Sequence, residues 1–147
     1  MSPYLDAGFL LTLLVPTHGS ALANQLLRHS DAPFELNFLH QLQAENLLRR
    51  MELSSDPARQ IAGRKGRALW RHYLDEGVFL LDLTDWNSAL EVAIAWNEHH
   101  SSPPPPPLLL LHPALAAISA CTAFLSFDPR SRSVAQAVGL RVLPDRL

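Results

Sequence analysis

The stretch that decides the fold is residues 124–143, FLSFDPRSRSVAQAVGLRVL. Its apolar start predicts a strand that ends at Asp128, and Ser131–Val138 predicts a short helix. Gly139 ends this helix, and Leu140–Leu143 predicts a final strand. A strand, a helix and a second strand in this order favour a parallel sheet with helices on its faces.

The rest of the chain shows the same alternation of strands and helices. Strands are expected at Pro3–Asp6, Pro33–Leu36 and Val78–Leu83, and helices at Ser20–His29, Leu39–Glu52, Pro57–Leu74, after Thr84 or Asp85, and at Leu108–Cys121. Residues 101–107, SSPPPPP, predict a stiff polyproline connection. We therefore expect an α/β fold in a single domain over residues 1–147, an α/β/α sandwich with a central, mostly parallel sheet and helices on both faces.

Helix starts and helix faces can be predicted as well. Ser20, Asn37 and Asp56 are expected to cap the helices that follow them, because their side-chain oxygens can accept hydrogen bonds from free backbone amides. In one helix, the residues expected on one face are Leu39, Leu42, Asn46 and Met51. In an amphipathic later helix, they are Leu90, Ile94 and Trp96. Gly63 and Gly66 weaken the middle of the helix that starts at Pro57.

The composition bounds the class of protein. A chain of 147 residues can bury its own core, and 48% hydrophobic with 18% charged residues is ordinary for a compact domain. The net charge of −2 gives no overall positive field, so nucleic-acid binding would need a local basic patch. The one cysteine, Cys121, excludes a disulfide framework and is expected to be a buried thiol. Without a signal-peptide pattern or a long apolar run, we expect a cytoplasmic protein that does not enter a membrane.

Two acidic residues stand at predicted strand ends, where active groups gather in open parallel sheets. Asp6 follows the first strand and Asp128 follows the strand that begins at Phe124. Carboxylates placed in this way can share a hard divalent cation such as Mg²⁺ or Mn²⁺. The simpler alternative is that each acid caps the helix after it, and spacing alone favours this capping role.

Four segments resemble the motifs of one known family. They are Tyr4-Leu5-Asp6-Ala7, residues 39–50 (LHQLQAENLLRR), residues 111–117 (LHPALAA), and residues 124–130 followed by 135–140. In this order they resemble the motifs of PIN domains, and in particular of the VapC-type ribonuclease toxins. The likeness covers about residues 3–144, and its last segment is the most specific. It implies a PIN fold in which four carboxylates gather around one or two Mg²⁺ or Mn²⁺ ions and cut RNA.

The resemblance can be carried over acid by acid. Asp6 matches the first acid of the family pattern and Asp128 matches the last. Gln43 stands where the second acid is expected, and Leu109 stands where the third is expected. Gln43 keeps a carbonyl oxygen without the charge, whereas Leu109 offers no ligand. Because affinity for a hard cation falls with ligand charge and number, metal binding is expected to be weak or absent.

Glu45 is the one residue that could compensate for the acid missing at Gln43. The two residues are two positions apart on a predicted helix, which is about 200° around the helix axis. Both side chains therefore cannot face the same pocket. Glu45 replaces the missing carboxylate only if the helix has a different register from the one that the motif suggests.

Several other features have both a functional and a structural interpretation. Residues 63–67, GRKGR, form a basic stretch in which Arg64, Lys65 and Arg67 could contact RNA or an acidic partner, although a solvated helix face is the commoner role. His112 precedes a proline in an apolar segment and is expected to be structural, and His99 and His100 have no partners at metal-binding spacing.

These patterns leave three hypotheses open. The first is a PIN-like protein with weakened or lost metal-dependent RNA cleavage and a remaining RNA- or protein-binding role. The second is an active Mg²⁺- or Mn²⁺-dependent endoribonuclease toxin of a toxin–antitoxin pair, using Asp6, Asp128 and Glu45. The third is a dimeric interaction module with no nucleic-acid role. The resemblance also implies a homodimer and a small antitoxin partner.

Overall fold

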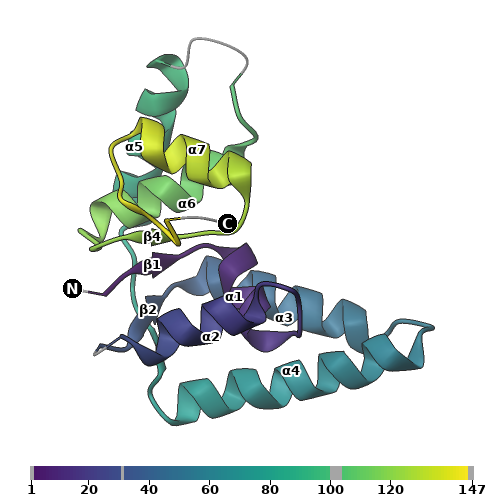
Figure 1. The fold of residues 1–147 in the computed structure, drawn as a ribbon. Coiled ribbons are helices and arrows are strands. Elements are labelled where there is room, and N and C mark those ends of the chain that lie inside the picture. Colours follow the sequence, from purple (N-terminus) through teal and green to yellow (C-terminus); the bar gives the residue numbers. More distant parts are fainter. Residues whose placement is uncertain (1, 31, 100–103, 146–147) are drawn as a thin grey trace. The chain divides into compact units, whose positions relative to one another are not determined.

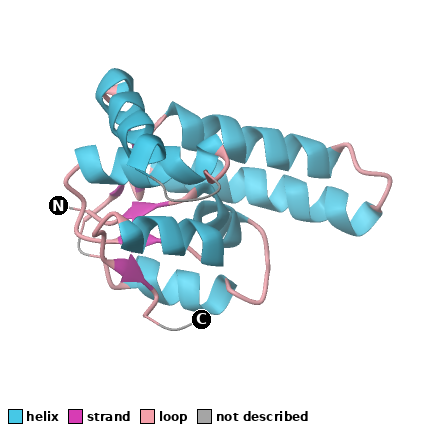
Figure 2. Cartoon of the chain, turned by 90° about the horizontal axis from the view of Figure 1, so that it is seen from above, coloured by secondary structure: helices cyan, strands magenta, loops and turns pink. Residues whose placement is uncertain are grey.

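The computed structural model describes residues 2–30, 32–99 and 104–145. The chain divides into a terminal unit, Met1–Asp6 with Leu83–Leu147, and an internal unit, Ala7–Asp82. Helices make up most of the described residues and the strands are short (Figure 2). Strand pairing is parallel throughout, so the expected mixed α/β class with parallel strands is confirmed.

The terminal unit holds a three-stranded parallel sheet in the order β1-β4-β5 (Figure 1). Its elements are β1 Tyr4–Leu5, α5 Trp86–His99, α6 Pro107–Ile118, β4 Phe124–Leu125, α7 Pro129–Ala137 and β5 Val142–Leu143. Residue 124 pairs with Tyr4 on one side and with Val142 on the other. The segment from residue 124 to 143 therefore forms the strand, helix and parallel strand that its pattern predicts.

The internal unit holds a parallel pair of strands, β2 with β3, and four helices. Its elements are α1 Ala7–Leu14, α2 Ser20–Arg28, β2 Phe34–Leu36, α3 Phe38–Glu52, α4 Pro57–Asp75 and β3 Phe79–Leu81. α1 forms in the apolar run of residues 8–15, where the sequence shows no hydrophobic period that would predict a helix or a strand. Gly77 follows α4 with a φ of +68°, a conformation that favours glycine and ends the helix.

The described strands pair as two small sheets rather than as one central sheet. The strands are only two or three residues long, and each sheet belongs to one unit. Two sheets of this size do not establish the expected α/β/α sandwich. The sandwich and the single domain over residues 1–147 remain predictions.

The core of the terminal unit contains an aromatic and histidine cluster. The rings of Tyr4 and Phe124 stack with centroids 5.9 Å apart and planes 7° from parallel. The Tyr4 hydroxyl lies 2.9 Å from Nδ1 of His112, which is buried in α6. A buried histidine with a hydrogen-bonding partner fits the structural role expected of His112.

The expected apolar face of α5 is correct for Trp96, which packs against the core, but wrong for Leu90 and Ile94. Leu90 and Ile94 are 47% and 59% exposed, whereas Ala89 and Ala93 are buried. Small side chains at spacing of four let α5 approach the core closely, and Ala93 packs there with residues of α6 and α7. Leu90 and Ile94 therefore lie away from the buried face.

The expected face of α3 is correct for Met51, which is buried, but wrong for Leu42, and two glycines of α4 explain why. Leu42 is 65% exposed, and the buried residues of α3 are His40, Ala44, Leu48 and Met51. A Cβ atom on Gly63 would lie 2.9 Å from Cβ of Met51, and one on Gly66 would lie 2.7 Å from Cδ2 of Leu48. The glycines, expected only to weaken α4, allow it to pack closely against α3. Since higher numbers on α4 face lower numbers on α3, the two helices are antiparallel.

Helix capping follows the sequence at most positions. The side chain of Asn37 accepts hydrogen bonds from the amides of Leu39 and His40, and Asp56 accepts one from Ala58. The prediction for α2 is wrong by one residue, because Gly19 is the N-cap residue. The Ser20 hydroxyl instead donates to the carbonyl oxygen of Thr12 at 2.9 Å, which ties α2 to α1.

Candidate functional site

Asp6 follows β1 and lies at the carboxyl end of the three-stranded sheet. Its backbone amide donates to the carbonyl oxygen of Leu125 at 2.9 Å, and only 5% of the residue is exposed. Because β1 and β4 are paired in parallel, the segments after Leu5 and Leu125 leave the sheet at the same edge. Asp6 and Asp128 therefore both follow the carboxyl ends of neighbouring strands in the terminal unit, as the sequence predicts.

Asp128 is engaged by its own helix. Its carboxylate caps α7 by accepting a hydrogen bond from the amide of Arg130 at 2.9 Å, and the guanidinium of Arg130 lies 3.3 Å from its second oxygen. Burial acts to raise the pKa of Asp128, but the hydrogen bonds and positive charge of Arg130 outweigh it and lower the pKa below its ordinary value. The capping interpretation of Asp128 thus describes its contacts in the structure.

The loop between β4 and α7 is fixed by a buried arginine that the sequence analysis missed. Arg132 is 8% exposed, and its two terminal nitrogens donate to the carbonyl oxygens of Ser126 at 2.9 Å and Pro144 at 2.7 Å. The hydroxyl of Ser126 accepts from the amide of Asp128 at 3.1 Å. These bonds hold Asp128 in place, and no sequence motif marked Arg132 for this task.

The acids of the terminal unit can be tested as a cation site from their donor chemistry. Asp6 and Asp128 supply two carboxylates, and the oxygens of Asp128 already accept from Arg130. Leu109, on α6, adds no ligand oxygen. Within residues 2–30, 32–99 and 104–145, no group of three or more His, Cys, Asp or Glu side chains could hold a metal ion. Water can fill most positions around Mg²⁺ or Mn²⁺, so the fit depends on the charge of the ligands. Two carboxylates, one of them already bound by Arg130, supply little charge, and this donor set therefore does not fit a Mg²⁺ or Mn²⁺ centre well.

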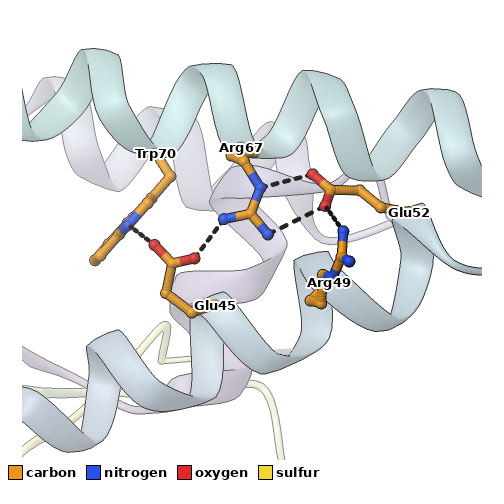
Figure 3. Close-up of polar contacts among 5 residues, drawn as sticks. All are labelled: Glu45, Arg49, Glu52, Arg67 and Trp70. Carbon is orange, nitrogen blue, oxygen red and sulfur yellow. Dashed lines mark hydrogen bonds and ion pairs between the residues drawn. The ribbon is translucent and has the colours of Figure 1, made fainter.

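Gln43 and Glu45 lie on α3 in the internal unit. Gln43 is half-buried. The carboxylate of Glu45 accepts hydrogen bonds from the guanidinium of Arg67 and, at 3.1 Å, from the indole Nε1 of Trp70 (Figure 3). Both donors belong to α4, which packs against α3. Glu45 is therefore engaged between the two helices.

Arg67 connects two acids of α3. Besides Glu45, it binds Glu52 through Nε at 2.6 Å, and its side chain is only 20% exposed (Figure 3). The hydrogen bonds that Arg67 donates to Glu52 and Glu45 raise the pKa of Arg67, and the one donated to Glu52 lowers the pKa of that carboxyl group. Both shifts favour the charged forms of Arg67 and Glu52. Arg67, one of the candidates for contact with RNA or a partner, ties α4 to α3 through these acids.

The remaining residues of the basic stretch have a different environment. Arg64 and Lys65 are exposed on α4. No hydrogen bond or ion pair among the described residues involves either side chain, which fits the predicted solvated helix face. The stretch thus contains one structural cation, Arg67, and two that are accessible to a ligand.

Two further expectations are resolved by the structure. Cys121 is half-buried rather than fully buried, and burial raises the pKa of its thiol. At the end of α5, Nδ1 of His99 lies within hydrogen-bond distance of the carbonyl oxygen of Ala95, at 2.7 Å. His100 lies outside the described residues.

Of the helices in the described part of the chain, none is long and apolar enough to span a bilayer.

A scan against protein-family models and a search of curated proteins found no match to this chain. The resemblance to PIN domains therefore depends on the motifs quoted above and on the α/β class of the fold.

Proposed function

We propose that this chain is a PIN-like protein, related to the VapC-type toxins, in which metal-dependent RNA cleavage is weakened or lost and a binding role remains. The observation that carries the proposal is the position of Glu45. Its carboxylate is bound by Arg67 and Trp70 and is part of the α3–α4 contact. The one residue that could have replaced the acid missing at Gln43 thus has a structural task.

The other expected acids support the same proposal. Asp128 caps α7 and pairs with Arg130, so its charge is partly neutralised. Leu109 stands where the resemblance places the third acid of the PIN pattern, and its side chain provides no oxygen ligand. Asp6 is the remaining acid, and one buried carboxylate with one paired carboxylate gives little charge to hold a dication. Weak or absent Mg²⁺ and Mn²⁺ binding follows from this donor set.

The proposal can be tested by measuring cleavage of a fluorophore–quencher RNA in Mg²⁺ or Mn²⁺. We expect cleavage at the background rate, with no change in Asp6→Asn. Robust metal-dependent cleavage that Asp6→Asn abolishes would overturn the proposal. Glu45→Gln distinguishes a structural role of Glu45 from a catalytic one. If the role is structural, the variant lowers the free energy of unfolding and leaves RNA cleavage unchanged.

The second candidate function is an active endoribonuclease toxin of a toxin–antitoxin pair, in the cytoplasm and as a homodimer. It is favoured by one observation, the position of Asp6 and Asp128 after paired parallel strands. This candidate requires Mn²⁺ binding, which isothermal calorimetry can measure on the wild-type chain. Heat of binding at millimolar Mn²⁺ that disappears in Asp6→Asn supports it, and the absence of such heat excludes it.

A further inference from the structure

An open groove of about 510 Å³ runs between α3 and α4 in the internal unit. On the α3 side it is lined by two acids, Glu45 and Glu52, and by Leu42, Asn46 and Arg49. The last three share one helix face because they are spaced by four and three residues. On the α4 side it is lined by Arg67 and Arg71, one turn apart. Cations and an apolar side chain therefore share this groove.

The middle of the groove is already paired. Arg67 is bound by Glu45 on one side and by Glu52 on the other (Figure 3). These three charges neutralise one another in part, and the side chain of Arg67 is mostly covered. A ligand in the groove would therefore have to bind positively charged side chains other than Arg67.

That charge is on Arg49 and Arg71. Arg71 lies one turn beyond Arg67 on α4, and Arg49 lies one turn beyond Glu45 on α3. Because α3 and α4 are antiparallel, Arg71 and Arg49 lie in opposite directions from the Glu45–Arg67 pair along the groove. The two arginines therefore flank this pair. The side chain of Arg49 is 64% exposed and its contact with Glu52 is long, at 3.7 Å. Arg71 is exposed, and no ion pair among the described residues involves it.

We infer that this groove binds an acidic peptide segment of a partner protein, with carboxylates at Arg49 and Arg71 and an apolar side chain on Leu42. Leu42 is 65% exposed and is the apolar member of the lining. Arginine at the flanks suits carboxylates, which it can bind through two parallel hydrogen bonds. The inference rests on the proposed function, because it names a partner class for a protein whose remaining role is binding.

The glutamates in the groove favour a peptide over RNA. An RNA strand carries a phosphate at every nucleotide, so a strand along the groove would bring phosphates next to Glu45 and Glu52. The side chain of Glu45 is 41% exposed and keeps part of its negative field. A peptide can place its carboxylates at the flanking arginines alone and set an uncharged residue over the middle.

The test uses a fluorescein-labelled synthetic peptide, Glu-Glu-Leu-Leu-Asp-Asp, and the full chain. We expect an increase in anisotropy, and a dissociation constant about tenfold higher in the double variant Arg49→Gln/Arg71→Gln. Leu42→Gln is expected to weaken binding several-fold. The matched control is Arg59→Gln, which removes an exposed charge of α4 outside the groove lining and should leave the constant unchanged.

Nuclear magnetic resonance on the wild-type chain gives a reading that needs no variant. We expect the Nε–Hε signals of Arg49 and Arg71 to shift with peptide and that of Arg59 to stay in place. No shift at millimolar peptide, or equal weakening by Arg59→Gln, would overturn the inference. So would displacement of the peptide by a single-stranded oligoribonucleotide that itself shifts these two signals. Cleavage is measured without peptide, so failure of this inference is distinguishable from failure of the proposed function.

Discussion

Asp128 and Glu45 both accept hydrogen bonds from an arginine, but the arginines come from very different distances along the chain. Asp128 of the terminal unit is bound by Arg130, two residues later in its own helix. Glu45 of the internal unit is bound by Arg67, 22 residues away on another helix. The first contact needs only a helix start, whereas the second needs α3 and α4 to pack at one register. An acid with a local partner can be interpreted from sequence, and an acid with a distant partner cannot.

The largest expected effect comes from separating α3 and α4 with Gly63→Val. A Cβ at this position would lie 2.9 Å from Cβ of Met51 and 3.0 Å from the backbone nitrogen of Glu52, so the helices must shift. We expect a loss of about 1–3 kcal/mol in the free energy of unfolding, measured by urea denaturation. The contacts of Glu45 with α4 should be lost with it, while those of Asp128 persist.

The control for this change is Ala68→Val, at an exposed position of the same helix. Valine costs about 0.5 kcal/mol there through its lower helix propensity alone. Valine has a higher helix propensity than glycine, so the absence of any loss in Gly63→Val would show that close packing at Gly63 contributes nothing to stability.

An intermediate effect is expected from double-mutant cycles on the two ion pairs. For Glu45→Gln with Arg67→Gln we expect a coupling energy of about 0.5–1 kcal/mol, since solvent screens the partly exposed Glu45. For Asp128→Asn with Arg130→Gln we expect about 0.2 kcal/mol, because the side chain of Arg130 is 74% exposed. Chemical denaturation at low salt measures both. A larger coupling for the Asp128 pair would reverse the comparison.

The smallest effect concerns the charge of Asp128. Its pKa in the folded state lies below the ordinary value of 3.8, so its carboxylate stabilises the fold above about pH 4 and this contribution is lost as pH falls through the folded-state pKa. Asn can still cap α7, so Asp128→Asn removes mainly the charge. At pH 6 we expect the wild type to be more stable by about 0.2 kcal/mol, the value of an exposed pair. This difference should disappear once the pH is below the folded-state pKa. A difference that stays constant with pH would show that the charge is not involved.

Strand and helix positions were largely predictable because they depend on near neighbours. Asn37 and Asp56 cap their helices, and the strands around Phe34 and Phe79 form where apolar residues predict them. Helix faces were less predictable. Leu42 and Leu90 are exposed because Gly63, Gly66 and small alanines set which sides pack, and hydrophobicity does not report small-residue packing.

The candidate site divides in the same way. Residue identity and local pattern were enough to predict that Asp6 and Asp128 follow strands. The positions of Gln43 and Leu109 as replaced acids come from the resemblance to PIN domains. Only the tertiary structure decided the role of Glu45. Its partners Arg67 and Trp70 are brought to it by the packing of α4 on α3, and side-chain hydrogen bonds between helices depend on a register that no local pattern contains.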